Sequence, residues 1–225
     1  MWSVPRMWEN ETCIIVGGGA SIPRQFGVPE TVIDEVLKGQ RGPDAYSPYM
    51  ESIHGQHVIA INIAFKIGPW IDCLFFGDSG FFSKYTDQIF AWKGLRVTCG
   101  ESMGDYSGKI KVLGRDRAKH GICFNPNTVC WNFNSGGAAI NFAVHTGVNR
   151  IILLGYDMKL DEQKNQHFHN YYHGNVKTVG ATMTMHMKGF PVIAEALKGK
   201  VEIINASPDS ALTCFPKMEF KEIKL

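Results

Sequence analysis

The feature that most constrains the fold is an apolar run that ends in glycines. Residues 14–16 read Ile-Ile-Val, and residues 17–21 read Gly-Gly-Gly-Ala-Ser. An unbroken run of β-branched residues is typical of a strand buried on both faces, as in a parallel sheet. Glycines directly after such a strand let backbone N–H groups approach phosphate oxygens. This segment therefore predicts the first strand of an α/β domain that binds a nucleotide.

A second segment, far along the chain, completes this pattern. Asn134-Ser135-Gly136-Gly137 precedes an apolar stretch, and the run 151–154 ends in Gly155-Tyr156-Asp157. Asn and Ser are good N-caps, so a helix is expected to begin here. The N-terminus of a helix carries about half a positive charge, which suits an anion. Capping alone would also explain these residues, and both interpretations are compatible.

Short apolar runs alternate with helical stretches along the whole chain. This alternation predicts an α/β fold, with a mostly parallel Rossmann-like sheet, helices on both faces and a single domain over residues 1–225. Strands are expected at 13–16, 58–61, 73–76, 96–99, 151–154 and 201–204, with a shorter strand at 122–124. Helices are expected at 30–37, 82–92, 137–146 and within 176–197, where Pro191 should end or kink the helix.

Segments 39–54 and 100–121 are polar and rich in Gly, Ser, Asp and Tyr. They are predicted to lie outside the core, as lids or binding loops.

The net charge and the share of charged residues bear on whether the protein binds nucleic acid. Net charge is +2 with 20% charged residues, so the composition is not basic enough to indicate binding of duplex DNA, although nucleic acid as a partner stays open. The basic residues of 109–119 are interpreted as a solvated loop.

No run of about 20 apolar residues predicts a membrane span, and no secretory leader is evident. The six cysteines lack zinc-ligand spacing, so reduced thiols and a cytoplasmic location are expected. Exposed Trp2 and Trp8 would suit a homo-oligomer.

Polar residues follow four of the predicted strands, and in a parallel sheet these ends meet at one crevice, where ligands bind. Single carboxylates such as Asp78 and Asp157 are often N-caps, and no Asp-x-Asp motif indicates a metal. The predicted nucleotide-binding residues are Gly17, Gly18, Gly19, Ser21, Asn62, Asp78, Asn134, Ser135, Gly136 and Asp157.

The densest titratable cluster comprises His167, His169 and His173, beside Tyr171 and Tyr172. A histidine with an ordinary pKa near about 6.5 suits acid–base catalysis near neutral pH. A transition-metal site and a plain surface loop are the alternatives. His186 stands in a Met-rich helical stretch, where core packing is the better explanation.

The order of these motifs resembles the bacterial sialyltransferases that use CMP-sialic acid. It is also similar to archaeal 6-hydroxymethyl-dihydropterin pyrophosphokinases and to motility accessory proteins of flagellin glycosylation. Small phage or prophage proteins of this superfamily are closest in pattern, through segments 134–136, 154–158, 167–173 and 205–212. This resemblance implies a location in the host cytoplasm for a phage protein.

The resemblance implies a metal-independent glycosyltransferase whose nucleotide-sugar donor lies between segment 17–21, Asn62 and segment 134–136. Asp78 would lie near the ribose or the reacting sugar, and a histidine of 167–173, His169 or His173 first, would deprotonate the acceptor. Gly18 and Asp78 replace asparagines of the family, so a neutral sugar is as plausible as sialic acid. The alternatives are Mg²⁺-dependent diphosphate transfer to a pterin-like alcohol, with Asp78 and Asp157 as ligands, and a non-catalytic nucleotide-binding phage protein.

Overall fold

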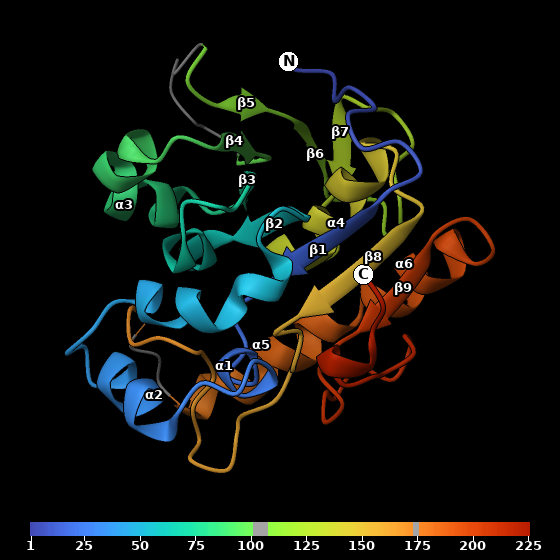
Figure 1. The fold of residues 1–225 in the computed structure, drawn as a ribbon. Helices are drawn as coiled ribbons and strands as arrows, with labels where there is room; N and C mark the ends of the chain where they lie inside the picture. The colour runs from blue at the N-terminus through green and yellow to red at the C-terminus, as the bar shows by residue number, and fades with distance from the viewer. Residues whose placement is uncertain (101–107, 173–175) are drawn as a thin grey trace.

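The computed structural model describes residues 1–100, 108–172 and 176–225. Its centre is a seven-stranded sheet in the order β5-β4-β3-β2-β1-β8-β9, and every pair of neighbouring strands is parallel (Figure 1). The strands are β1 Thr12–Val16, β2 His57–Ile61, β3 Cys73–Phe76, β4 Leu95–Thr98, β5 Lys111–Val112, β8 Arg150–Leu154 and β9 Glu202–Asn205. The predicted Rossmann-like α/β class is confirmed.

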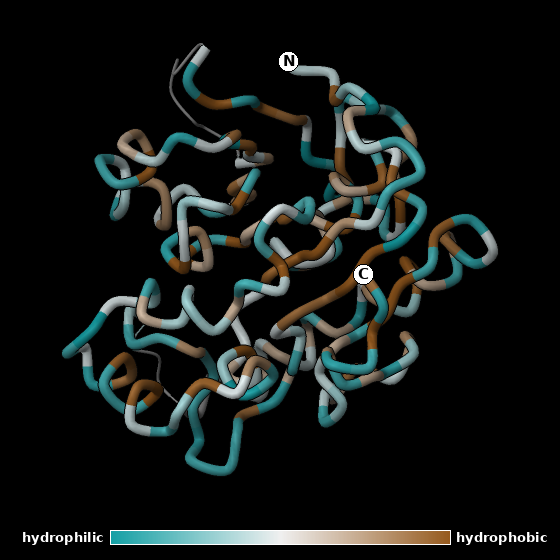
Figure 2. Tube along the Cα trace, viewed as in Figure 1, coloured by the Kyte–Doolittle hydropathy of each residue, from teal (hydrophilic) through white to brown (hydrophobic). Residues whose placement is uncertain are grey.

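Helices cover both faces of this sheet, as predicted. Alternate residues of β1 point to opposite faces, because side chains alternate along a strand. Ile14 and Val16 pack in one apolar cluster, whereas Cys13 and Ile15 pack in the other. The first face is covered by α1 Ile22–Gln25, α2 Glu30–Leu37, η1 Pro43–Ile53, η2 Asn62–Ile67 and α3 Ser79–Ala91. The second is covered mainly by α4 Ser135–His145 and α6 Phe190–Leu197. Figure 2 shows the brown, apolar colour concentrated along the central strands.

The predicted strand at 122–124 is wrong. The backbone of Cys123 instead pairs with the side chain of Asn141, whose Oδ1 accepts from the Cys123 N–H (2.9 Å) while Nδ2 donates to its carbonyl (2.9 Å). A small parallel pair forms nearby, from β6 Gly114–Asp116 and β7 Thr128–Cys130.

The helical region near the C-terminus is interrupted as predicted. α5 Val176–Met187 ends before α6, and Pro191 stands in the first turn of α6, where its missing N–H is tolerated.

Segment 39–54 does not lie outside the core. Most of it forms the 3-10 helix η1, and Tyr46, Met50 and Ile53 are fully buried. Although most residues of this segment are polar, its few apolar side chains pack into the core and hold the segment there. In segment 100–121, residues 101–107 lie outside the described residues, and the remainder supplies β5, β6 and the buried Leu113.

The expectation of an exposed Trp pair is wrong for Trp8, which is buried and stacks on His57 with 4.7 Å between ring centroids. Trp2 is half-buried against Phe142.

The thiols of Cys13, Cys73 and Cys99 are buried and free, as expected. Within the described ranges, no helix combines the length and apolarity that crossing a bilayer demands.

Candidate functional site

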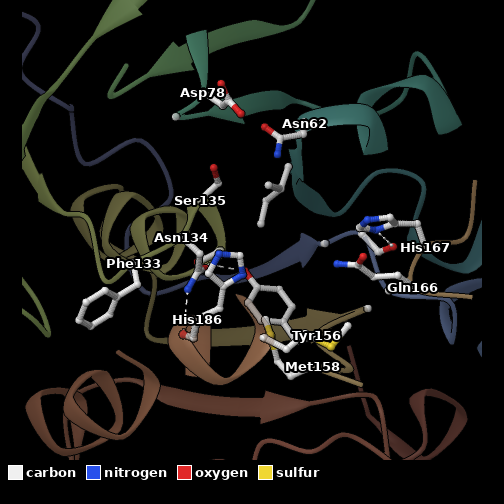
Figure 3. A pocket seen from close by; sticks show the side chains of 18 of the residues that line it. Asn62, Asp78, Phe133, Asn134, Ser135, Tyr156, Met158, Gln166, His167 and His186 are labelled. Atoms are coloured by element: carbon white, nitrogen blue, oxygen red, sulfur yellow. Dashed lines mark hydrogen bonds between the residues drawn. The ribbon is translucent and has the colours of Figure 1, made fainter. Parts of the chain in front are cut away.

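The candidate site lies where the sheet topology reverses. From the central β1 the chain proceeds to β2 on one side, and β8 pairs with the other side of β1. Loops leaving the carboxyl ends of two such strands diverge and open a crevice. A cavity of about 650 Å³ occupies this position (Figure 3).

Most of the predicted site residues meet in this cavity. Its walls include Gly17, Gly18, Gly19, Asn62, Asp78, Asn134, Ser135, Gly136, Asp157, His167 and His169. Ser21 is not part of the wall, and His173 lies outside the described residues.

The glycine turn after β1 packs against the turn after β8. The Gly17 N–H donates to the Leu154 carbonyl (2.8 Å) and the Gly19 N–H to the Gly155 carbonyl (2.9 Å). A Cβ on Gly19 would lie 2.5 Å from the Asp157 carboxylate and 2.7 Å from the Gly155 oxygen. Both N–H groups therefore already donate within the protein, and a contact of the glycine turn with phosphate stays a prediction.

Ser21 fixes Asp157 rather than facing the cavity. Its backbone N–H donates to Oδ2 (2.9 Å) and its hydroxyl to Oδ1 (2.6 Å) of Asp157. The Ser207 hydroxyl lies 3.1 Å from that of Ser21. Asp157 is buried in the cavity wall with both carboxylate oxygens engaged.

The N-terminus of α4 forms another wall. Asn134 caps the helix, as predicted: its Oδ1 accepts from the Gly137 N–H (2.8 Å), and its Nδ2 donates to the carbonyls of Asn132 and His186 (both 3.0 Å). Ser135 and Gly136 follow in the first turn, where N–H groups have no partner within the helix. The positive end of the helix dipole therefore faces the cavity.

Asp78 and Asn62 lie on the same side of the cavity in Figure 3. Asp78 is exposed and caps α3, accepting from the Gly80 N–H (2.7 Å). Asn62 has φ of 51°, and its buried Oδ1 lacks a hydrogen-bond partner among the described residues.

His167 and His169 have opposite hydrogen-bonding roles. Nδ1 of His167 lies 3.1 Å from the Gly18 carbonyl, and a carbonyl only accepts, so this nitrogen carries the proton. In the neutral ring Nε2 then keeps its lone pair. Nδ1 of His169 instead accepts from the Tyr171 N–H (3.2 Å), so its Nε2 carries the proton. The two rings are parallel, with centroids 5.1 Å apart.

Burial is the main cause that lowers the pKa of both rings. For His169 the pKa falls to about 3, and the nearby His167 adds to the effect. For His167 the hydrogen bond to Gly18 and the charge of Asp157 oppose the lowering. Both rings are therefore neutral near neutral pH.

The lowered pKa of His169 predicts a loss of stability in acid. The unfolded chain takes up a proton at this residue below about pH 6.5, whereas the folded protein does not until about pH 3. Between these limits this residue should therefore raise the equilibrium constant of unfolding by up to about tenfold for each unit that the pH falls. Urea unfolding at pH 7 and pH 5 tests this: His169→Gln should show the shallower decline, and an equal decline would contradict it.

The interpretation of residues 109–119 as a solvated loop is wrong for Arg115. Arg115 stacks over Trp131, 3.9 Å from the ring centroid, and donates from Nε to the Cys99 carbonyl (2.7 Å) and from a terminal nitrogen to the Gly77 carbonyl. Arg115 and Arg117 both line the cavity and make it more cationic.

Several cavity residues were not predicted as site residues. No motif contains four of them, which are Trp131, Phe133, Lys159 and Gln166. Met158 and Tyr172 stand in segments 154–158 and 167–173, but neither was assigned a role. His186 was expected to pack among methionines in the core; it lines the cavity instead, together with the buried Met183 of α5. Across residues 1–100, 108–172 and 176–225, no three His, Cys, Asp or Glu side chains gather as metal ligands.

Comparison with protein-family models, with curated proteins and with solved structures finds no match for this chain. The resemblance drawn from the motifs therefore stays a prediction.

Proposed function

We propose that this protein is a metal-independent glycosyltransferase that uses a nucleotide-sugar donor. The observation that supports this is the composition of one cavity. It joins an open helix N-terminus, beside arginines, to a neutral histidine that keeps a lone pair. The helix N-terminus and the arginines would stabilise the negative charge of the departing phosphate. The histidine would remove the proton from the acceptor hydroxyl.

In the proposed reaction, the acceptor hydroxyl gives its proton to Nε2 of His167. Its oxygen bonds to the anomeric carbon of the donor sugar, while the bond from that carbon to the phosphate oxygen breaks. The electron pair leaves with the nucleotide. The N-terminal N–H groups of α4 and the charges of Arg115 and Arg117 stabilise the phosphate, as fixed dipoles do without reorganisation.

His167 suits the base role better than His169. The lone pair of the neutral His169 ring already accepts from the Tyr171 N–H, and Nε2 of that ring is a donor. His169 is instead suited to donate a hydrogen bond to a substrate oxygen.

Mg²⁺-dependent diphosphate transfer is less well supported by the carboxylates. Both Asp157 oxygens accept from Ser21, and one oxygen of Asp78 accepts from Gly80. Coordination of Mg²⁺ would require these hydrogen bonds to be shared or broken.

Turnover without metal is the expected result that tests the proposal. The protein would be incubated in excess EDTA with CMP-, UDP- and GDP-sugars, and the released nucleotide measured. At least one donor should be consumed. Activity that appears only with ATP and Mg²⁺ would indicate the pyrophosphokinase instead. A thermal shift with a nucleotide but no turnover of any donor would indicate a binding module; a ligand at about 100 times its Kd adds roughly 2.7 kcal/mol.

A further inference from the structure

Phe133 has an unusual backbone conformation at the cavity wall. Its φ is 66°, and that of the preceding Asn132 is 51°. Left-handed backbone is uncommon for a bulky side chain, and such conformations gather at ligand sites. The chain turns here directly before Asn134, the cap of α4.

Three other segments hold this turn in place. The side chain of the fully buried Asn132 accepts from the Gly121 N–H (2.7 Å) and donates to the Gly121 carbonyl (2.8 Å). Gly137 of α4 and Gly189 before α6 also pack on Asn132, and a Cβ on either would lie within 2.9 Å of its atoms. The position of Phe133 is thus fixed by the surrounding structure.

The same hydrogen bonds bring His120 against Phe133. The two rings stack with centroids 4.4 Å apart and an interplanar angle of 24°. His120 is exposed, and Phe133 is half-buried in the cavity wall. Because the imidazole covers one face of the phenyl ring, the remaining ring surface is what a ligand can contact.

Figure 3 shows Phe133 on the opposite side of the cavity from His167, with Asn134 and Ser135 between them in this view. A nucleotide sugar has the same order: a planar base, then the phosphate, then the transferred sugar. With phosphate at the N-terminus of α4 and the reacting sugar toward His167, the base falls beside Phe133.

We infer that Phe133 is the stacking platform for the nucleobase of the donor, an inference that rests on the proposed nucleotide-sugar site. The ring, held by Asn132 and backed by His120, presents an apolar aromatic surface to a flat heterocycle. Base–aromatic stacking contributes about 5- to 150-fold in affinity.

Titration calorimetry in EDTA tests this by comparing the affinities for CMP, UMP, GMP and AMP with the affinity for ribose 5-phosphate. Ribose 5-phosphate keeps the sugar and the phosphate but lacks the base. Phe133→Gly fits the φ of this position and removes the ring. Phe133→Leu keeps an apolar side chain and removes only the aromatic surface, so it separates stacking from packing even where the glycine variant folds poorly. Phe124→Ala is the matched control, because Phe124 is exposed and is not part of the cavity wall.

The wild-type protein and Phe124→Ala should bind at least one nucleotide about 5- to 150-fold tighter than ribose 5-phosphate. In both Phe133 variants this ratio should fall toward one while ribose 5-phosphate binds as before. An unchanged ratio would refute the stacking role of Phe133 but not the nucleotide site. An equal loss of affinity for the nucleotide and for ribose 5-phosphate would assign Phe133 a purely structural role and refute the inference. No binding of any nucleotide by the wild-type protein would overturn the proposed function and this inference together.

Discussion

Replacing His167 with glutamine is expected to lower kcat by about 100- to 10,000-fold, the usual contribution of a general base. Glutamine retains a side-chain N–H that can donate to the Gly18 carbonyl, so the loop should keep its position. What it lacks is a basic nitrogen for the acceptor proton. Steady-state rates with the donor identified in the EDTA assay measure this effect, and the KM for the donor should change little.

The pH profile gives the same prediction a second readout. Because burial holds the pKa of His167 below its ordinary value, the rate should be constant at neutral pH and fall only in acid, as the base is protonated. His57→Gln is the matched control: His57 pairs with Glu11 (2.7 Å) at the amino end of β2, outside the cavity wall. Equal rates for His167→Gln and His57→Gln would refute the assignment of the base.

Gly19→Ala is expected to have the largest effect on stability. The new methyl group would lie 2.5 Å from the Asp157 carboxylate and 2.7 Å from the Gly155 carbonyl oxygen, so the two turns would have to separate. Overpacking of this kind costs about 3 kcal/mol, which is roughly 6–12 °C in Tm for a chain of this size. Differential scanning calorimetry measures the loss, and nucleotide binding should weaken with it because both turns line the cavity.

Gly180→Ala provides the matched control for this substitution. Gly180 is exposed in α5, and a Cβ there meets no atom within 4 Å. Alanine is the better helix former, so this variant should be more stable by up to about 1 kcal/mol. If Gly19→Ala melted at the wild-type temperature, the close packing of the two turns would be refuted.

Much of the fold could be predicted because a buried parallel strand has a local sequence pattern, a short run of apolar residues. The run at 13–16 and the run at 151–154 contain only residues that a two-sided interior accepts, and both became central strands. The caps Asn134 and Asp78 were equally predictable, since a capping side chain acts on residues two or three positions ahead.

What could not be predicted depends on partners distant in sequence. The strand expected at 122–124 failed because Asn141, 18 residues away, satisfies the Cys123 backbone. Arg115 enters the cavity because Trp131 offers it a ring face. Neither the proton on Nδ1 of His167 nor the role of Ser21 could be inferred without knowing that Gly18 and Asp157 are their partners.

The link between Ser21 and Asp157 also has a consequence for biosynthesis. It joins residues separated by 136 positions, and β8 completes the central pairing with β1 at a similar separation. Contacts this distant form late, since the entropy of closing a long loop must be overcome first. While the ribosome is still making the middle of the chain, one side of the apolar β1 has no neighbour. A chaperone that shields unpaired strands would therefore act between translation of β1 and the emergence of β8, and ligand affinity would appear only after β8 has docked.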